Sequence, residues 1–368
     1  VNSTPPTGFM NSGTATDPTP QLVTIDNQSA QYSTQSADAS VSMVTGDVGA
    51  SIKSRQIYAS NTVVHNVRCI RMLGERFQMS ESTTQTAQTP EVPMITLRDG
   101  NQIPQIGLGV LRIDNDGVVP VVESALQVGY RHIDGAAGYN NEEGVGRALA
   151  ESGYNAGEQR KSLWMTTKLR DSEQGYDSAL RAFDRSLELL QLDYVDMYML
   201  HWPTPFNWRS GETWKAFDRL RSEGRVRTLG VCNFLPEHLE RLHEETGEYP
   251  AVNQIELHPT WQQRGVVAYC KEHNIAVEAY SPMARGADLA NGVVEEIARA
   301  HGVTPAQVIL RWHIENGTII IPKSVHVERQ RENLDLFGFA LTPEEHAQID
   351  ALDGPTRAGH DPLTFTYA

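Results

Sequence analysis

The sequence is dominated by a regular alternation of short apolar segments with longer amphipathic ones, which runs from Met94 to about Leu352. The short segments have the length and β-branched content of buried strands, and the longer ones carry apolar residues at helical spacing. Repeated strand–helix units predict parallel strands joined by right-handed crossovers. Strands are expected at 106–110, 130–134, 163–168, 194–200, 226–232, 251–256, 275–280 and 318–321. Helices are expected at 117–128, 141–151, 178–190, 212–223, 236–245, 264–273, 293–301, 305–315 and 326–334.

Eight strands in a segment of this length predict an α/β fold of the (β/α)8, or TIM-barrel, class. A β-hairpin is expected to plug its N-terminal end, because residues 94–97 and 102–106 flank a turn that contains Asp99-Gly100. Thr342 and Pro343 start one more helix, as N-cap and first helical residue. An open doubly wound sheet is the structural alternative, and the absence of Gly-x-Gly-x-x-Gly after an early strand disfavours it.

Residues 1–93 differ in composition from the rest of the chain. Ser, Thr, Gln, Asn and Ala dominate there, and such a segment buries too little apolar surface to offset the entropy of ordering. We predict that it is a low-complexity, disordered segment, in which residues 57–77 could form a strand or short helix. Since the chain begins with Val, and Met94 precedes the regular part, residues 1–93 could also be a non-native extension. Residues 94–352 would form the barrel, and 353–368 a C-terminal tail near its functional face.

Composition restricts the classes of partner and the compartment. The net charge of −15 argues against nucleic acid or an anionic membrane as the main partner. No apolar run is long enough to cross a bilayer, and the N-terminus lacks the pattern of a secretory signal. The three cysteines show no metal-type spacing and fit free thiols in a reducing compartment. We therefore predict a cytoplasmic protein that binds no metal.

Polar residues follow three successive predicted strands where each strand ends. Asp134 ends one strand and Tyr139 lies in the loop after it, Lys168 ends the next, and His201 ends the third. Strand ends of a barrel meet at its catalytic face, so these four side chains are expected to form a proton-transfer set. A neighbouring ammonium stabilises a phenolate and lowers the pKa of the tyrosine. Each residue alone also has a structural explanation, such as a cap, a solvated lysine or a buried histidine.

The residues from Met94 to about Leu352 resemble the aldo-keto reductase family, and most of all its bacterial branch that includes 2,5-diketo-D-gluconate reductases. The resemblance implies Tyr139 as general acid, Lys168 and Asp134 as the pair that tunes it, and His201 as the residue that orients the substrate carbonyl. It covers nearly the whole barrel and none of residues 1–93. It rests on Gly107-Leu108-Gly109, His132-Ile133-Asp134, Thr166-Thr167-Lys168, His201-Trp202-Pro203, Gly230-Val231-Cys232-Asn233-Phe234, Asn253-Gln254-Ile255-Glu256-Leu257-His258-Pro259 and Ile321-Pro322-Lys323-Ser324-Val325.

The same resemblance implies a nicotinamide dinucleotide cofactor that is bound without a Rossmann fingerprint. Two cations and a hydroxyl near a 2′-phosphate favour NADPH over NADH. In the family's order, Asn233 and Gln254 would bind the carboxamide, Tyr280 would stack on the nicotinamide ring, and Arg285 would contact the pyrophosphate. The full set of cofactor-binding residues implied is Cys232, Asn233, Gln254, Tyr280, Ser281, Arg285, Lys323, Ser324, Arg329, Glu332 and Asn333.

Several positions depart from the family's pattern. Gly135 stands where Thr is frequent, and Cys232 replaces a Ser, which puts a thiol near the nicotinamide. The loop after His201 is short, which implies an open substrate pocket. Two arginines, Arg112 and Arg170, could recognise the carboxylate of a keto acid or could simply be solvated. The substrate-binding residues implied are His201, Trp202, Leu111 and Arg170.

We expect an oxidoreductase that reduces aldehydes and ketones to alcohols with NADPH. Its substrates would be small carbonyl compounds such as α-dicarbonyls, keto sugars or keto acids. The alternative is a cofactor-binding regulatory or interaction subunit on the same barrel, with little turnover and residues 1–93 as an interaction arm. A barrel metal hydrolase is disfavoured, because the strand ends present no His/Asp cluster of metal type. The resemblance implies a monomer.

Overall fold

The computed structural model describes residues 58–59, 62–63 and 92–365. The chain divides into two compact units, Val1–Thr83 and Thr84–Ala368. In the first unit, β1 (Tyr58–Ala59) and β2 (Thr62–Val63) form an antiparallel pair within the stretch for which a strand was expected. Apart from these short strands and residues 92–93, the segment predicted to be disordered lies outside the described residues.

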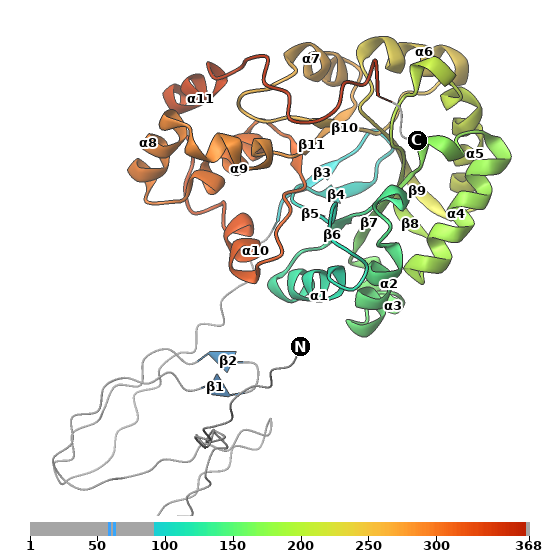
Figure 1. Ribbon diagram of the computed structural model, residues 1–368, viewed down its shortest axis with the longest axis horizontal. Helices are drawn as coiled ribbons and strands as arrows, with labels where there is room; N and C mark the ends of the chain where they lie inside the picture. The colour runs from blue at the N-terminus through green and yellow to red at the C-terminus, as the bar shows by residue number, and fades with distance from the viewer. Residues whose placement is uncertain (1–57, 60–61, 64–91, 366–368) are drawn as a thin grey trace, which may run out of the picture. The chain divides into compact units, whose positions relative to one another are not determined.

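Eight parallel strands form the centre of the second unit, in the order β12-β11-β10-β9-β8-β7-β6-β5. The sheet closes into a barrel through a parallel bridge between Ile106 and Ile320, where Gly107 N donates to Ile320 O at 2.8 Å. Figure 1 looks into this ring of strands. The predicted (β/α)8 class is confirmed. The strands are β5 (Leu108–Gly109), β6 (His132–Asp134), β7 (Trp164–Leu169), β8 (Val195–Leu200), β9 (Val226–Cys232), β10 (Val252–Glu256), β11 (Ala276–Tyr280) and β12 (Ile319–Ile320).

Helices surround the strands and bury their apolar faces against them (Figure 1). In α4, for example, Ala179, Phe183 and Leu187 are buried one turn apart. None of the described helices has the length and apolar character needed to cross a membrane. The helices are α1 (Val118–Val128), α2 (Glu142–Glu151), α3 (Gly157–Lys161), α4 (Tyr176–Leu190), α5 (Ser210–Ser222), α6 (Pro236–Thr246), α7 (Arg264–Glu272), α8 (Gly292–His301), α9 (Pro305–Glu315), α10 (Val327–Leu334) and α11 (Pro343–Asp350).

The sequence predicted these elements closely, with differences at their ends. The first strand is shorter than expected, because only Leu108 and Gly109 pair with β6, and Ile106 reaches β12 through the single bridge. The one-turn helix α3 was not expected, since five residues carry too little periodicity to be read. Thr342 caps α11 as predicted, and its side chain accepts from Glu345 N.

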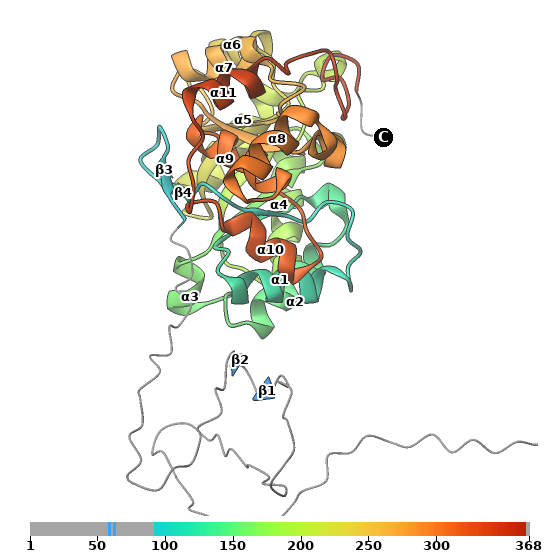
Figure 2. The ribbon, with the colours of Figure 1, turned by 90° about the vertical axis from the view of Figure 1, so that its left-hand side faces the viewer.

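The N-terminal hairpin plugs one end of the barrel. Strands β3 (Met94–Thr96) and β4 (Gln102–Pro104) pair antiparallel, as expected from the Asp-Gly turn. Leu97 and Ile103 are buried in a cluster with interior barrel residues such as Met197. Figure 2 shows the hairpin at one end of the barrel and the C-terminal segment at the other. The carboxyl ends of the strands, at the end opposite the hairpin, therefore remain available for a site.

Candidate active site

Four side chains from successive strand ends meet at the open end of the barrel. Lys168 Nζ lies 2.7 Å from both carboxylate oxygens of Asp134 and donates to Gly135 O at 2.9 Å. It also donates to the Tyr139 hydroxyl at 3.3 Å. The imidazole of His201 approaches the Tyr139 ring edge-on, with 5.7 Å between ring centroids. The structure thus brings together all four residues of the predicted proton-transfer set.

The turn that carries Tyr139 is held by its neighbours. It is a 3-10 turn, η1 (Ala137–Tyr139), which ends at Asn140 in the left-handed conformation with φ 59°. The Arg170 guanidinium donates to Ala137 O at 2.5 Å and to Asn140 Oδ1 at 2.6 Å. Arg170 therefore braces the catalytic turn, and these contacts differ from the carboxylate-binding role considered from the sequence.

Burial and charge set the protonation states of the four groups. Burial is the largest single influence on the pKa of Lys168 and would lower it, but Asp134, with Tyr139 and Cys232 nearby, raises that pKa above its ordinary 10.5. Burial raises the pKa of Tyr139 above its ordinary 10.0, and Lys168 offsets only part of that rise. Lys168 thus lowers the pKa of Tyr139, as expected from the sequence, but burial raises it by more, so the net shift of that pKa is upward. Burial, with Lys168 and Arg170 nearby, lowers the pKa of His201 to about 3. At neutral pH the site therefore holds an ammonium, a phenol and a neutral imidazole.

Beside the four residues lies a second polar group that the sequence associated with a nicotinamide. The Gln254 amide nitrogen donates to Asp134 Oδ1 and to Glu278 Oε2, each at 2.9 Å. Both amide hydrogens are thereby used, so the carbonyl oxygen alone remains to bind a ligand. The Tyr280 hydroxyl donates to Asn233 Oδ1 at 2.9 Å, and Asn233 Nδ2 donates to His201 O at 3.1 Å. Asn233 and Tyr280 therefore form one connected group.

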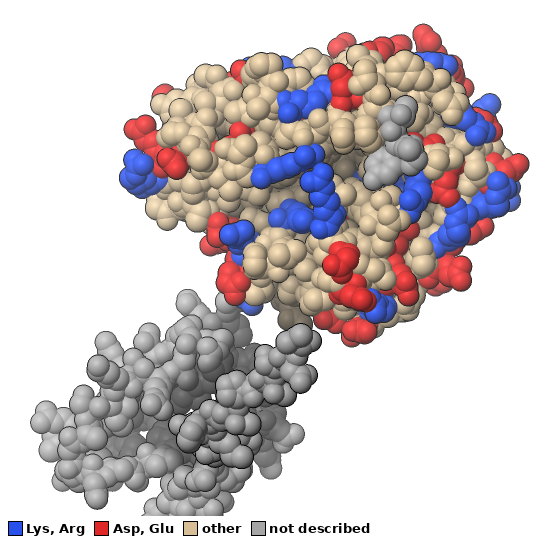
Figure 3. Space-filling view, in the orientation of Figure 1, with Lys and Arg blue, Asp and Glu red and all other residues tan. Residues whose placement is uncertain are grey.

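The remaining predicted cofactor residues differ in their exposure. Arg285, Lys323 and Arg329 are exposed and form no ion pair within the part of the chain that the structure describes. Figure 3 shows Lys and Arg side chains gathered beside a hollow near the middle of one face. The other predicted cofactor residues contact the protein itself or are partly covered by it. Cys232 is buried with Sγ 3.8 Å from Met199 Sδ, and Ser281 is half-buried. Ser324 Oγ bonds the backbone of His326, Glu332 accepts from Thr304 Oγ1, and Asn333 is buried near Tyr130.

The C-terminal segment covers part of the pocket wall. Trp202 is buried, and its ring lies 4.4 Å from the ring of Phe365. Leu111, the other apolar wall residue predicted, is exposed. A small pocket opens beside Asn233 and Tyr280 and is also lined by Arg357.

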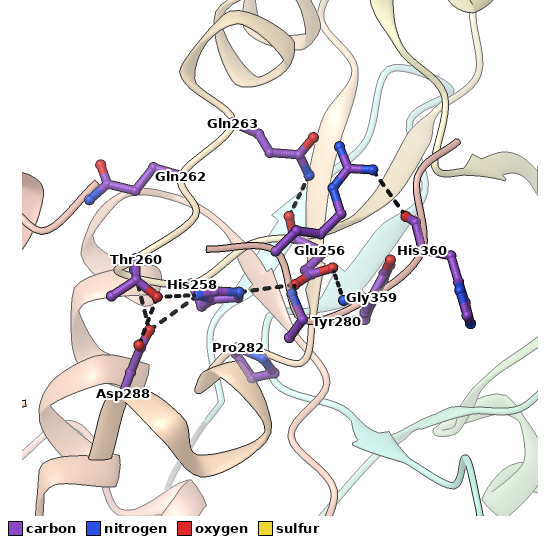
Figure 4. A network of polar contacts seen from close by, with 12 residues as sticks. Glu256, His258, Thr260, Gln262, Gln263, Tyr280, Pro282, Asp288, Gly359 and His360 are labelled. Carbon is purple, nitrogen blue, oxygen red and sulfur yellow. Dashed lines mark hydrogen bonds and ion pairs between the residues drawn. The ribbon is translucent and has the colours of Figure 1, made fainter. Parts of the chain in front are cut away.

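The tail is held by a polar network that the sequence analysis missed. The Glu256 carboxylate accepts from Ala358 N at 2.5 Å and from Gly359 N at 2.7 Å. His258 lies between Glu256 and Asp288, with Nε2 3.0 Å from one carboxylate and Nδ1 3.2 Å from the other (Figure 4). Burial alone would lower the pKa of His258, but hydrogen bonds to Asp288 and Glu256 raise it. In the sequence, the only local sign of this network is that Glu256 and His258 stand two residues apart in the stretch 253–259.

Comparison with known proteins agrees with this geometry. The sequence profile of the aldo/keto reductase family matches residues 105–354. An aldo-keto reductase of Mycolicibacterium smegmatis is 50% identical over 275 residues, which cover 75% of this chain and 98% of that protein. Methylglyoxal reductase DkgA of Escherichia coli strain K12 is 44% identical over 274 residues, or 74% of this chain and 98% of the relative. The structure of a Gox0644 mutant in complex with NADPH has a TM-score of 0.71 and 44% identity, and covers 75% of this chain and all of that one.

Fold and site together define a barrel oxidoreductase that uses NADPH to reduce carbonyl groups. The chain belongs to the aldo/keto reductase family, as the match over most of its length shows. The bacterial branch that includes 2,5-diketo-D-gluconate reductases, which the sequence motifs indicated, agrees with the similarity to DkgA.

The residues present fit this cofactor. Both hydrogens of the Gln254 side-chain amide are engaged by Asp134 and Glu278, so Oε1 is the atom of this amide that would accept a carboxamide N–H. Lys323 and Arg329 are exposed cations that form no ion pair among the described residues, so both could bind a phosphate.

Proposed function

We propose that this enzyme reduces small aldehydes and α-dicarbonyls, keto sugars or keto acids to alcohols, with Tyr139 as the general acid. The observation that carries the proposal is the chain of contacts from the Tyr139 hydroxyl to Lys168 at 3.3 Å and on to Asp134 at 2.7 Å. A relative named as a methylglyoxal reductase supports α-dicarbonyls within this range.

The side chains divide the reaction between them. When bound, NADPH supplies a hydride to the carbonyl carbon. Tyr139 donates its hydroxyl proton to the carbonyl oxygen as negative charge develops there. Lys168 stabilises the phenolate that this leaves, and Asp134 keeps Lys168 charged and in place. His201, as a neutral imidazole, orients the carbonyl oxygen through a ring N–H and does not compete as an acid.

The cofactor would lie across the strand ends from β9 to α10. Asn233 and the Gln254 carbonyl oxygen would bind the carboxamide, above buried Cys232, and Tyr280 would stack on the nicotinamide. Ser281 and Arg285 would follow the pyrophosphate. The exposed cations at Lys323 and Arg329 support a 2′-phosphate site. The residues proposed for the adenosine end are Lys323, Ser324, Arg329, Glu332 and Asn333.

The substrate pocket would be open and lined by His201, Trp202 and Leu111. We assign the catalytic domain to residues 94–352 and a pocket-covering tail to 353–368, because every residue named in the mechanism lies in the first and Phe365 contacts Trp202 from the second. A monomeric state and a cytoplasmic location stay predictions from the sequence.

The test is NADPH oxidation followed by absorbance with a panel of carbonyl compounds. Glyceraldehyde, methylglyoxal, a diketo sugar acid and a steroid ketone would rank the substrate class. Tyr139→Phe should lower kcat by about 10²- to 10⁴-fold, the usual contribution of a general acid. Tyr154→Phe is the matched control, because this buried tyrosine packs under Arg131 away from the site. Turnover that survives in Tyr139→Phe would contradict the assignment of the general acid.

A further inference from the structure

Glu278 is a carboxyl group inside the barrel that the mechanism above does not use. It lies on β11, its side chain is completely buried, and Oε2 accepts from the Gln254 amide at 2.9 Å. The same amide donates to Asp134 Oδ1 at 2.9 Å, so one glutamine joins Glu278 to the proposed catalytic carboxylate. Among the described residues, two buried carboxyl groups therefore lie beside one ammonium, that of Lys168.

The other oxygen of Glu278 faces a histidine. His132 Nε2 lies 3.5 Å from Glu278 Oε1, and neither atom has another hydrogen-bond partner in the described part of the chain. His132 Nδ1 lies 3.3 Å from Pro104 O, which can only accept, so Nδ1 carries the proton. The ring cannot move away, because it packs on Gly107, where a Cβ atom would lie 2.6 Å from Nδ1.

A proton between these two atoms would satisfy both of them. An ionised carboxylate and the bare Nε2 of a neutral imidazole are both acceptors and would be left unpaired in the barrel interior, which is costly. With the proton on Glu278, Oε1 would direct a donor toward His132 Nε2, 3.5 Å away. Burial lowers the pKa of His132 to about 4. Burial, and then the nearby Asp134 charge, raise the pKa of Glu278 to about 8. At neutral pH the proton therefore resides on Glu278.

We propose that Glu278 is a positioning residue, which is held as a neutral carboxylic acid so that the Lys168 ammonium faces only the charge of Asp134. This proposal rests on the proposed roles of Tyr139, Lys168 and Asp134. In its neutral form Glu278 also fixes Gln254, whose carbonyl oxygen is then left for the nicotinamide.

Ionisation of Glu278 at alkaline pH adds a second negative charge beside Lys168. The titratable groups that face Glu278 are His132 and Asp134 on β6, Lys168 on β7 and Cys232 on β9. With two carboxylates around it, the ammonium stabilises a developing Tyr139 phenolate less well, so kcat for carbonyl reduction falls. Tyr139 itself cannot cause this fall, because its pKa is raised above 10.

The test is the pH profile of kcat at saturating NADPH, from pH about 6 to about 10. In the wild type, kcat should fall about 3- to 10-fold as the pH rises through an inflection near pH 8. A fall of this size is expected if the ionisation of Glu278 raises the pKa of Tyr139 by roughly one unit. Glu278→Gln, which mimics the neutral acid, should remove the inflection. Glu142→Gln is the matched control, since Glu142 is a second buried carboxyl with a raised pKa, bonded to Thr167 and Ser186 and to neither Gln254 nor His132. This variant should keep the inflection.

A second measurement does not depend on turnover. Infrared difference spectra between neutral and alkaline pH should show a buried carboxylic acid ionising in the wild type and in Glu142→Gln, and not in Glu278→Gln. An inflection unchanged in Glu278→Gln, or no such acid in the wild-type spectra, would overturn the proposal. If instead Tyr139→Phe stayed active while the Glu278 band titrated, the roles in the proposed function would fail and the protonation of Glu278 would stand.

Discussion

Lys168 shows at the scale of single residues how this protein stabilises a charge in its interior. Lysine is almost never fully buried unless it is paired, and removing an ion from water costs several kcal/mol. Here Nζ has both oxygens of Asp134 at 2.7 Å and the carbonyl of Gly135 at 2.9 Å. Lys168 and Asp134 therefore act as one unit, and the Tyr139 hydroxyl is the fourth oxygen around the ammonium.

Arg170 holds the turn that carries Tyr139, and its contribution can be tested by substitution. Its guanidinium bonds Ala137 O and Asn140 Oδ1, the two ends of the turn that carries Tyr139. Arg170→Ala should lower kcat by about 10- to 100-fold for every substrate, because small misplacements of a catalytic group are costly. The measurement is steady-state kinetics with a neutral aldehyde and a keto acid of similar size.

Arg112 provides the matched control for this experiment. It is exposed in the loop after β5 and has no ion pair among the described residues. If a carboxylate subsite exists there, Arg112→Ala should raise KM for the keto acid alone. An Arg170→Ala variant with unchanged kcat and a higher KM only for the keto acid would instead support Arg170 as the carboxylate-binding residue.

The C-terminal tail is the element whose placement depends most on long-range contacts. It has no regular secondary structure between Leu352 and Phe365, yet the Glu256 carboxylate accepts two of its backbone N–H groups. Glu256 is in turn bonded to His258, which Asp288 holds from the other side (Figure 4). A short polar network on β10 and in the loop after it thus positions a pocket wall that belongs to a distant part of the sequence.

Gly359 is the contact point at which this element can be tested. A Cβ atom there would lie 2.5 Å from Glu256 Oε2 and 3.2 Å from the Tyr280 hydroxyl. Gly359→Val should displace the tail, because the two backbone hydrogen bonds to the Glu256 carboxylate would be lost, and each is worth at most about 1.5–3 kcal/mol. The displacement should raise KM for the carbonyl substrate about 5- to 50-fold and speed proteolysis of the tail. Substrate kinetics and limited proteolysis would measure both effects.

Gly338→Val serves as the control for backbone stiffening alone. Gly338 is exposed, and a Cβ atom there would meet nothing within 4 Å. It should leave KM and the proteolytic pattern as in the wild type. Identical behaviour of the two variants would mean that the tail does not depend on its contact with Glu256.

At the scale of the whole molecule, buried neutral histidines make stability depend on pH. Burial lowers the pKa of His132 to about 4, of His201 to about 3 and of His313 to about 4, each from an ordinary 6.5. Between those values and 6.5 the unfolded chain binds more protons than the folded one, so stability rises with pH there. Stability present above pH 6.5 is therefore lost as the pH falls toward 4.

The expected result is a drop in the thermal unfolding midpoint of about 5–10 °C between pH 7 and pH 5, because each kcal/mol shifts a domain of this size by about 2–4 °C. His313→Gln should flatten this dependence, whereas His326→Gln, at an exposed histidine, should not change it. Calorimetry across the same pH range would measure the slopes. Equal slopes in all three proteins would show that buried histidines do not cause the effect.

The barrel, and the side chains that it brings together around Lys168, could be predicted from the sequence because they depend on local pattern. Strand and helix periods are visible along the chain, and Asp134, Lys168 and His201 each end a strand, so the closed barrel had to bring them to one face. The contacts between distant ionisable side chains could not be predicted from the sequence in this way. Glu278 lies in a strand whose other residues are ordinary, and only closure of the barrel places it beside Asp134 and His132.

The fold class could be read from the succession of strands and helices along the chain. The four residues of the proposed proton-transfer set could be predicted because three strand ends carry them, and the cofactor was implied by the family resemblance. Only the tertiary structure decided the net direction of the Tyr139 pKa, the bracing role of Arg170 and the partner of Glu256 in the tail. These depend on burial and on contacts between residues far apart in the chain. Desolvation and hydrogen bonding act through space, and spacing along a sequence does not record them.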